Sequence, residues 1–328
     1  MSASVPVIGS KETPAQRAKR RGPLKTPPYI PSLGFPRNTG RAGRDPLTAL
    51  ASCRLCPRSC GVNRLAGERG YCRAGAGARV AAVSLHHGEE PPISGMRGSG
   101  TVFFSHCNMV CRFCQNYPIS QLGHGRDMDL GTLSEEMMRL QDRGAHNVNF
   151  VTPTPHAAHV AGGVLLARAQ GFTIPVVYNT NGYDSPRALS LLEGIVDIYL
   201  PDAKYRSPEL AAALSGTPGY VPANDAALAE MVRQVGFLRV GRNGIGTRGV
   251  LVRHLVLPGK VEETQAVLAR LAITVGPDLP LSLMGQYFPA WKAPGTPDLG
   301  RKPTRREYGR AVAAASRLSF RNIFIQEL

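Results

Sequence analysis

The chain has 328 residues, of which 43% are hydrophobic, and a formal net charge of +16. It contains no run of about 18 apolar residues, which excludes an ordinary transmembrane helix. Its first residues lack the apolar stretch of a secretory signal. We therefore expect a cytoplasmic protein with one large domain and one small segment, and without membrane association.

Basic residues are concentrated at the N-terminus. Residues 1–45 contain nine Lys or Arg residues against two acidic ones, with many prolines and little periodicity. This composition predicts a disordered, basic, Pro-rich leader over residues 1–48. The remaining positive charge favours nucleic acid or an acidic protein as a partner. A solvated basic surface without a partner explains the charge equally well.

Four cysteines follow the leader in one short loop, at the spacing Cys-x2-Cys-x3-Cys-x11-Cys: Cys53, Cys56, Cys60 and Cys72. The chain has seven cysteines, and this odd number argues for metal ligation in a reducing compartment rather than disulfides. Four thiolates complete a coordination shell, so the loop predicts either structural Zn²⁺ or a second iron–sulfur cluster. We assign residues 49–95 to this Cys-rich metal-binding segment and residues 96–328 to the main domain.

The other three cysteines are Cys107, Cys111 and Cys114, at the spacing Cys-x3-Cys-x2-Cys with Phe113 before the last. Three thiolates at this spacing hold three irons of a [4Fe–4S] cluster and leave the fourth iron open to a small molecule. The alternative is a structural zinc site with His106 as the fourth ligand. An adjacent His–Cys pair chelates a single ion awkwardly, which favours the cluster.

Apolar runs and amphipathic stretches alternate along the rest of the chain. The expected strands span residues 102–104, 147–152, 174–178, 196–200, 250–257 and 281–288. Helical faces begin at Leu133, Leu228 and Thr264, and capping boxes begin at Thr132 and Thr304. This alternation predicts an α/β fold with a parallel sheet. About six β/α units are too few for a closed barrel, so we expect an open, partial (β/α)6 barrel of TIM type, with ligands at the C-terminal strand ends.

The motif at Cys107, Cys111 and Cys114 resembles that of the radical S-adenosylmethionine (radical SAM) superfamily. The resemblance implies that the open iron chelates S-adenosylmethionine. It also implies that one electron then splits this molecule into methionine and a 5′-deoxyadenosyl radical, which is chemistry that belongs to the cofactor. An open partial barrel is the fold of this superfamily.

Residues 50–290 are similar to the superfamily branch that contains the activating enzyme of pyruvate formate-lyase, and to relatives of it with an extra N-terminal cysteine cluster. Residues 97–104 lead into the cysteine loop as they do in that branch, and residues 252–259 match its strand–Pro-Gly element. The resemblance implies a radical that abstracts hydrogen from a partner, such as a glycine of a glycyl-radical enzyme.

Four residues at strand ends match positions near S-adenosylmethionine in that branch. Asn179 and Asn181 stand where the family carries a Thr-Asn-Gly, and amides bind ribose hydroxyls; the alternative is a turn-forming Asn-Gly pair. Asp202 and Lys204 stand in the place of an Asp-x-Lys stretch that faces the cofactor. They can position the charged ends of the cofactor, and the alternative is an ordinary ion pair.

The resemblance gives roles to four further residues. Phe113 packs against the adenine or shields the cluster, and His254 binds the cofactor or substrate unless it is structural. The family's Gly-Gly-Glu after the second strand is absent, and residues 151–156 stand in its place. The hydroxyls of Thr152 and Thr154 can replace it. This departure indicates a divergent substrate.

A reduced cluster requires an electron donor, and the basic surface suits an acidic one such as flavodoxin or ferredoxin. We expect a protein substrate rather than nucleic acid. One alternative is an RNA-modifying radical SAM enzyme, which the charge favours; methyl-transferring members need more cysteines near the C-terminus, and none follows Cys114. The other alternative is a non-catalytic zinc-binding protein that uses both cysteine groups.

Overall fold

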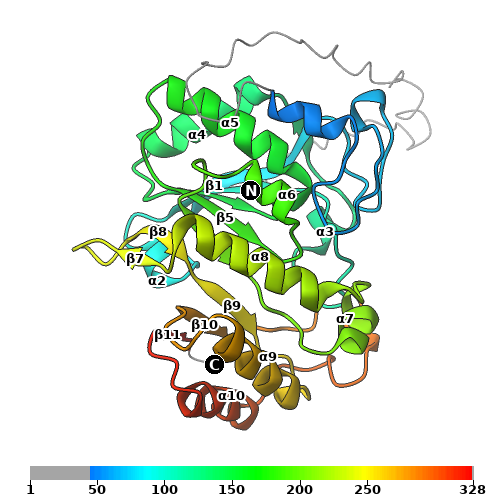
Figure 1. Cartoon of the computed structure of the whole chain (residues 1–328), viewed down its shortest axis with the longest axis vertical. Coiled ribbons are helices and arrows are strands. Elements are labelled where there is room, and N and C mark those ends of the chain that lie inside the picture. The colour runs from blue at the N-terminus through cyan, green and yellow to red at the C-terminus, as the bar shows by residue number, and fades with distance from the viewer. Residues whose placement is uncertain (1–44, 327–328) are drawn as a thin grey trace, which may run out of the picture. The chain divides into compact units, whose positions relative to one another are not determined.

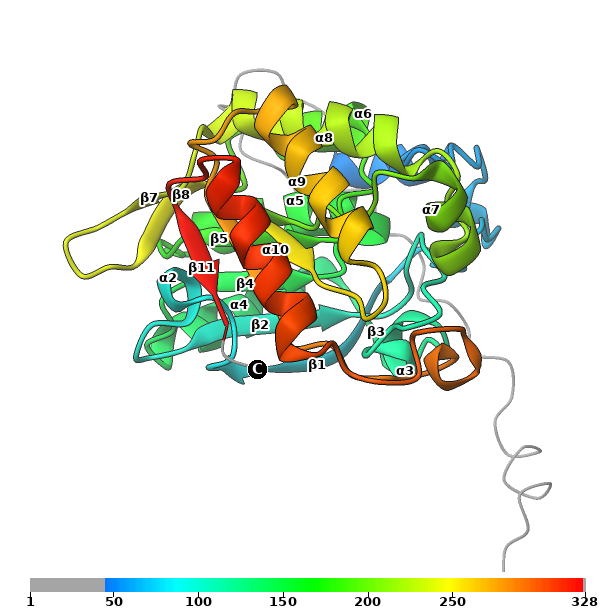
Figure 2. The same ribbon diagram turned by 90° about the horizontal axis from the view of Figure 1, so that it is seen from below.

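The computed structural model describes residues 45–326, so the predicted leader over residues 1–48 lies almost wholly outside the described residues. The described residues form an α/β fold with an eight-stranded sheet and a three-stranded sheet (Figures 1 and 2). Within residues 45–326, no helix has both the length and the apolar character needed to cross a membrane.

The large sheet is mostly parallel at its centre and antiparallel at both edges. Its strands, in spatial order, are β3 (Arg126–Met128), β1 (Ala78–His86), β2 (Ser99–Phe104), β4 (Val148–Val151), β5 (Val176–Thr180), β6 (Ile198–Pro201), β8 (Gly246–Val250) and β7 (Arg239–Val240). The run from β2 to β8 is parallel throughout. Every residue of β4, β5 and β6 is buried, as expected for strands covered on both faces.

The small sheet continues the curve of the large one. It consists of β9 (Val252–Leu255), β10 (Leu281–Met284) and β11 (Ile323–Ile325), all parallel. A parallel bridge between Asp202 and Arg253 connects the end of β6 to β9. The result is the predicted open, partial barrel.

Helices cover the outer face of this curved sheet (Figure 1). The longer ones are α4 (Leu130–Asp142), α5 (Ala157–Ala169), α7 (Pro208–Ser215), α8 (Tyr220–Val235), α9 (Val261–Thr274) and α10 (Arg305–Arg317). Short helices are η1 (Pro46–Leu50), η2 (Arg64–Ala66), α2 (Pro91–Ser94), α3 (Tyr117–Ser120), η3 (Thr154–His156), α6 (Pro186–Ser190) and η4 (Ala293–Gly295). The main apolar core lies between helices and sheet, and includes Phe150, Tyr178 and Leu133. A smaller apolar layer on the other sheet face includes Val177 and Leu200.

The predicted helical faces are confirmed, but one predicted cap is wrong. The N-cap of α4 is Asp129, whose carboxylate accepts a hydrogen bond from the Thr132 backbone N–H, so the helix begins before the predicted capping box. The capping box of Thr304 and Glu307 at α10 is present. Asp129 precedes the apolar stripe by a full turn, which is the position where an N-cap residue is expected.

The predicted strands differ from the observed ones mainly at their ends. The prediction for residues 250–257 spans the end of β8 and all of β9, and the prediction for 281–288 is too long because β10 ends at Met284. Strand β1 and the edge strands β3, β7 and β11 were not predicted. Strand β1 comes from the predicted Cys-rich segment and pairs with β2, while the domain boundaries at 48 and 95 stay a prediction.

Candidate active site

The loop with Cys107, Cys111 and Cys114 follows β2 directly, at the C-terminal edge of the parallel strands. Two backbone hydrogen bonds join this loop to the end of α7. The Val110 N–H donates to Ser215 O at 3.1 Å, and the Arg112 N–H donates to Leu214 O at 2.8 Å. The three cysteines are thereby held at the edge where ligands gather in barrels of this class.

Each of the three thiols has a polar neighbour at its sulfur. Ser215 Oγ donates to Cys111 Sγ at 3.0 Å, Asn181 Nδ2 donates to Cys107 Sγ at 3.3 Å, and Ser120 Oγ lies 3.1 Å from Cys114 Sγ. Hydrogen bonds to sulfur are among the features that tune iron–sulfur clusters. Three thiols in one loop with such neighbours fit a cluster that has one open iron.

Burial keeps these thiols protonated in the absence of a metal. It raises the pKa of Cys111 to about 11, although the positive charge of Lys204 opposes the rise. The pKa of Cys107 is raised by burial and then by the nearby Cys111 and Cys114. Binding a metal would release the protons of these thiols.

A charged network crosses the inner face of the barrel next to this loop. The Arg253 guanidinium contacts the carboxylates of Glu89 at 3.3 Å and Asp202 at 3.1 Å, and Lys204 Nζ lies 2.5 Å from Asp202 Oδ2. All four side chains are at most 15% exposed. Asn179 joins them, because its Nδ2 donates to Glu89 Oε1 at 3.2 Å and its Oδ1 accepts from Arg253 at 2.5 Å.

The ion pairs set the charge states in this network. Burial alone would raise the pKa of Asp202, but Lys204 and Arg253 together lower it. The pKa of Lys204 is raised in spite of burial, because Asp202 and Cys111 favour the ammonium. Burial raises the pKa of Glu89 against the opposing charge of Arg253. A fixed ammonium therefore lies beside the cysteine loop.

The second group of cysteines lines one small cavity. Cys53, Cys56, Cys60 and Cys72 all contribute to a cavity of about 20 Å³. Burial raises the pKa of Cys56 to about 12 and raises that of Cys72. Within residues 45–326, no group of three or more His, Cys, Asp or Glu side chains is arranged to hold a single metal ion.

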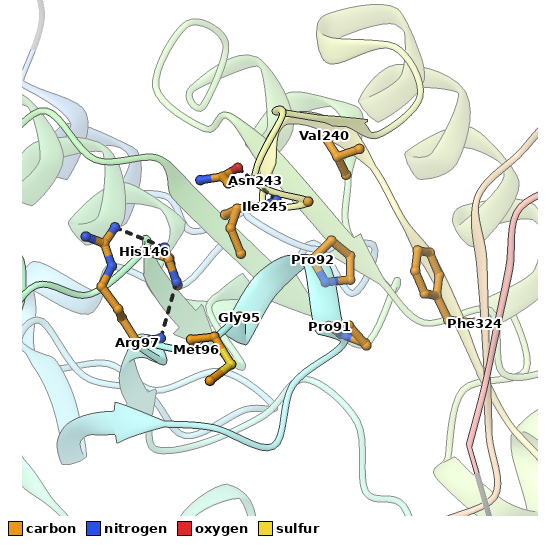
Figure 3. A pocket seen from close by; sticks show the side chains of 11 residues that line it. Pro91, Pro92, Gly95, Met96, Arg97, His146, Val240, Asn243, Ile245 and Phe324 are labelled. Carbon is orange, nitrogen blue, oxygen red and sulfur yellow. Dashed lines mark hydrogen bonds between the residues drawn. The ribbon is translucent and has the colours of Figure 1, made fainter.

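A larger pocket of about 560 Å³ lies at the opposite edge of the sheet (Figure 3). It is lined by residues that precede β2, β4 and β8, including Met96, His146 and Ile245. Arg97 closes one side of it, and its guanidinium lies 3.1 Å from His146 Nδ1. This pocket is apolar and contains none of the cysteines or network residues, so its size does not make it the catalytic site.

A family model for the radical SAM superfamily matches residues 101–272. The chain belongs to this superfamily. An uncharacterized protein of Methanocaldococcus jannaschii is 30% identical over 282 residues, which cover 83% of this chain and 77% of that protein. The residues matched by the family model include the cysteine loop and the parallel strands that follow it, from β4 to β9. Membership in a superfamily of enzymes makes the protein an enzyme.

Two solved structures resemble the chain at low identity. Native anSMEcpe with bound AdoMet is 12% identical with a TM-score of 0.48, over 72% of this chain and 62% of that one. The FeFe-hydrogenase maturase HydG from Carboxydothermus hydrogenoformans is 13% identical with a TM-score of 0.48, over 70% and 54%. The radical SAM chain therefore spans less than two thirds of either structure.

Several of the predicted cofactor-binding residues lie near the radical SAM motif. Asn181 contacts Cys107, and the Asp202–Lys204 pair lies in the inner network. Phe113 is buried, with its ring centroid 6.2 Å from that of Tyr287. Thr152 follows β4 with φ +59, a conformation that a β-branched residue rarely adopts and that is typical of functional sites.

Two other predicted residues have their polar groups occupied elsewhere. Thr154 is fully buried, and its hydroxyl lies 3.0 Å from that of Thr180. Both ring nitrogens of His254 are in contact, one with Ala203 O at 2.6 Å and one with Thr264 Oγ1 at 3.0 Å. Neither side chain is brought to the cysteine loop, so their predicted contacts with cofactor have no support from the geometry.

Sequence reasoning missed Arg253 and Asn108. Arg253 precedes His254 in β9 and therefore points to the opposite face, where it joins Glu89 and Asp202. Asn108 follows Cys107, and its Oδ1 accepts from Asn181 Nδ2 at 2.8 Å. A polar residue inside the cysteine motif was the available signal for Asn108. No signal in the sequence separated Arg253 from the other arginines.

We expect the protein to lose stability as the pH falls from about 6.5 to about 4. Burial lowers the pKa of His254 to about 4 and that of His159 to about 3. In this window the unfolded chain takes up protons that the folded chain excludes, so each such histidine costs up to about 1.4 kcal/mol per pH unit. Urea denaturation at several pH values measures the slope.

The matched comparison is His254→Gln against His124→Gln, because His124 is exposed. The first substitution should flatten the pH dependence and the second should leave it unchanged. Equal slopes in the two variants would contradict the assignment of acid sensitivity to His254.

Proposed function

We propose that Cys107, Cys111 and Cys114 hold a [4Fe–4S] cluster and that the protein is a radical SAM enzyme acting by reductive cleavage of S-adenosylmethionine. When bound, the cluster and S-adenosylmethionine supply a 5′-deoxyadenosyl radical. The observation that carries the proposal is the group of three thiols with polar neighbours at each sulfur, in a chain of this superfamily.

The chain's own residues supply positioning and exclusion of water. Asn181 orients toward the Cys107 sulfur, and the Lys204 ammonium, fixed by Asp202, can bind a carboxylate at the strand ends. Buried Met109, Phe113 and Tyr287 surround the cysteine loop with apolar groups. A dry site protects a reactive radical from side reactions.

The finer proposal concerns the partners. Following the resemblance to activating enzymes of the pyruvate formate-lyase type, we propose a glycine of a glycyl-radical protein as substrate and a cytoplasmic, acidic flavodoxin or ferredoxin as electron donor. The four other cysteines would hold zinc or a second iron–sulfur cluster. Superfamily membership favours an enzyme over a non-catalytic zinc-binding protein.

The test is cleavage of S-adenosylmethionine by the anaerobically reconstituted full chain with dithionite, measured as 5′-deoxyadenosine. Wild type should produce it and Cys111→Ala should not. Ser316→Ala, an exposed change on α10, should match wild type. Wild type with a loaded and reduced cluster that neither cleaves nor binds S-adenosylmethionine would refute the proposal.

A further inference from the structure

One fully buried side chain lies between the two groups of cysteines. The side chain of Asn108 lies near Cys56 of the first group and lowers the pKa of that thiol, although burial raises it more. Its Oδ1 lies 3.9 Å from Cys107 Sγ of the second group, and its Nδ2 donates to Tyr183 O at 2.7 Å. A single amide thus contacts Cys107 and lies beside Cys56, although the two cysteines are far apart in the sequence.

A second contact holds the two cysteine loops together. Arg58, between Cys56 and Cys60, donates to Asn108 O and to Gly216 O, each at 2.7 Å. Its guanidinium carbon lies 3.3 Å from the ring centroid of Tyr71. The packing at Gly216 is tight, because an added Cβ would lie 2.7 Å from Val110 of the radical SAM loop. The loop of the four cysteines and the radical SAM loop are therefore packed closely around Asn108.

The two groups differ in their exposure to solvent. In the radical SAM loop, Cys111 is 8% exposed and Phe113 is 5% exposed. In the other group Cys60 is exposed, and so is Tyr71 beside it. Cys107 and Cys114 are half-buried, so none of the three sulfurs of this loop is as exposed as that of Cys60. A large protein donor therefore reaches the four-cysteine group more easily than this loop. The four-cysteine group has one exposed cysteine, Cys60, and its Arg58 contacts Asn108 in the interior.

The surface around the four cysteines carries positive charge. Arg54, Arg69 and Arg73 are all exposed there, and Glu68 is the one acidic residue between Cys53 and Cys72. A basic surface steers an acidic partner to its docking site and raises the association rate. Zinc has no redox chemistry, so a structural zinc site would gain nothing from this exposed position or from sharing a side chain with Cys107.

We propose that Cys53, Cys56, Cys60 and Cys72 hold a second iron–sulfur cluster, and that this cluster is the electron-entry site for the radical SAM motif through Asn108. The role as entry site rests on the proposed function of the radical SAM motif. A reduced acidic donor of the flavodoxin or ferredoxin class is oxidised by one electron. That electron would reduce the second cluster and then pass to the cluster proposed at Cys107, so the second cluster returns to its oxidised state and no bond is made or broken.

The first test is the metal content of the anaerobically purified full chain. We expect about eight irons and eight sulfides per chain, as two four-iron clusters require, and no zinc. The double variant Cys56→Ala/Cys60→Ala should lose half of the iron. It should keep the reduced-cluster EPR signal of the motif at Cys107 under dithionite. Wild type with one zinc and half the expected iron would overturn the proposal.

The second test is the rate at which reduced flavodoxin generates the EPR signal of the inner cluster. Asn108→Leu should keep the wild-type iron content and slow reduction by flavodoxin severalfold more than it slows reduction by dithionite. The matched control is Asn322→Leu, an exposed position far along the chain. A wild-type rate in an iron-replete Asn108→Leu protein would overturn the role of Asn108.

A surface variant tests the entry site without disturbing the core. Arg54→Glu/Arg69→Glu should slow reduction by flavodoxin, most clearly at low salt, while the exposed Arg306→Glu should not. Equal rates in both variants would refute electron entry at this surface. Failure of the proposed function can be told apart from failure of this inference. Iron content and the rate of reduction by flavodoxin can both be measured in a protein that does not cleave S-adenosylmethionine.

Discussion

Replacing Arg253 by methionine should lower the free energy of unfolding by about 3 to 5 kcal/mol, the usual cost of breaking a buried ion pair from one side. Arg253 is 13% exposed and neutralises two carboxylates, those of Glu89 and Asp202. Methionine fills a similar volume, so the loss reports charge and hydrogen bonding rather than a cavity. Urea denaturation of the apo chain provides the measurement.

Two further variants separate these causes. Arg253→Met combined with Glu89→Gln should recover part of the loss, because it removes one of the carboxylates that the single variant leaves unpaired. Arg317→Met, an exposed change on α10, should stay within about 0.5 kcal/mol of wild type. An Arg253→Met protein as stable as Arg317→Met would show that the network carries no net stability.

The substitution should also weaken the site. Without Arg253, Asp202 has Lys204 as its remaining ion-pair partner and Asn179 loses the partner of its Oδ1. We expect Lys204 to become less fixed, so that binding of S-adenosylmethionine weakens in the same variant. Equilibrium binding to the reconstituted protein distinguishes this effect from the change in stability.

The parallel centre of the fold was predictable from the sequence because its strands are short, mainly apolar runs. Strands β4, β5 and β6 are covered on both faces, which gives them a local signal that needs no knowledge of neighbours. The antiparallel strands lack that signal. In β1, half-buried and polar residues mix with alanines, and its place beside β2 and β3 depends on long-range pairing.

The candidate site was predictable where a motif marked it and not where strand phase decided it. The cysteine spacing and the Asp202–Lys204 pair are local patterns, and the structure brings them to one edge. His254 and Arg253 are neighbours in β9, so only one of them can face the inside of the barrel. The four residues of β9 do not reveal from the sequence which of the two that is, so the sequence singled out His254 and not Arg253.

Replacing Gly182 by alanine should destabilise the protein more than a glycine-to-alanine change at an uncrowded position with the same backbone angle. Gly182 has φ +75, and an added Cβ would overlap the Asp202 carbonyl and the Asn224 side-chain amide. The left-handed conformation costs about 1 to 2 kcal/mol for a residue with a Cβ, and overpacking adds about 1 to 3 kcal/mol. Urea denaturation measures the sum.

Gly194→Ala is the matched control, because Gly194 has φ +76 and a Cβ added there would meet nothing within 4 Å. It should therefore show the conformational cost alone, and the difference between the two variants isolates the overlap at Gly182. Asn224 cannot retreat easily, since its Nδ2 donates to both Gly182 O and Asp202 O at 3.0 Å. Equal losses in both variants would show that this contact relaxes freely.

The same overlap should reach the cysteine loop. Gly182 follows Asn181, whose Nδ2 contacts the Cys107 sulfur and Asn108 Oδ1. Displacing this turn moves an amide away from both, so Gly182→Ala should alter the EPR signal of the reconstituted cluster while Gly194→Ala leaves it unchanged. Because Asp202 O borders the same turn, the glycine sets the distance between the cysteine loop and the ion pair with Lys204. An unaltered signal in a destabilised Gly182→Ala protein would mean that stability and site geometry are independent at this turn.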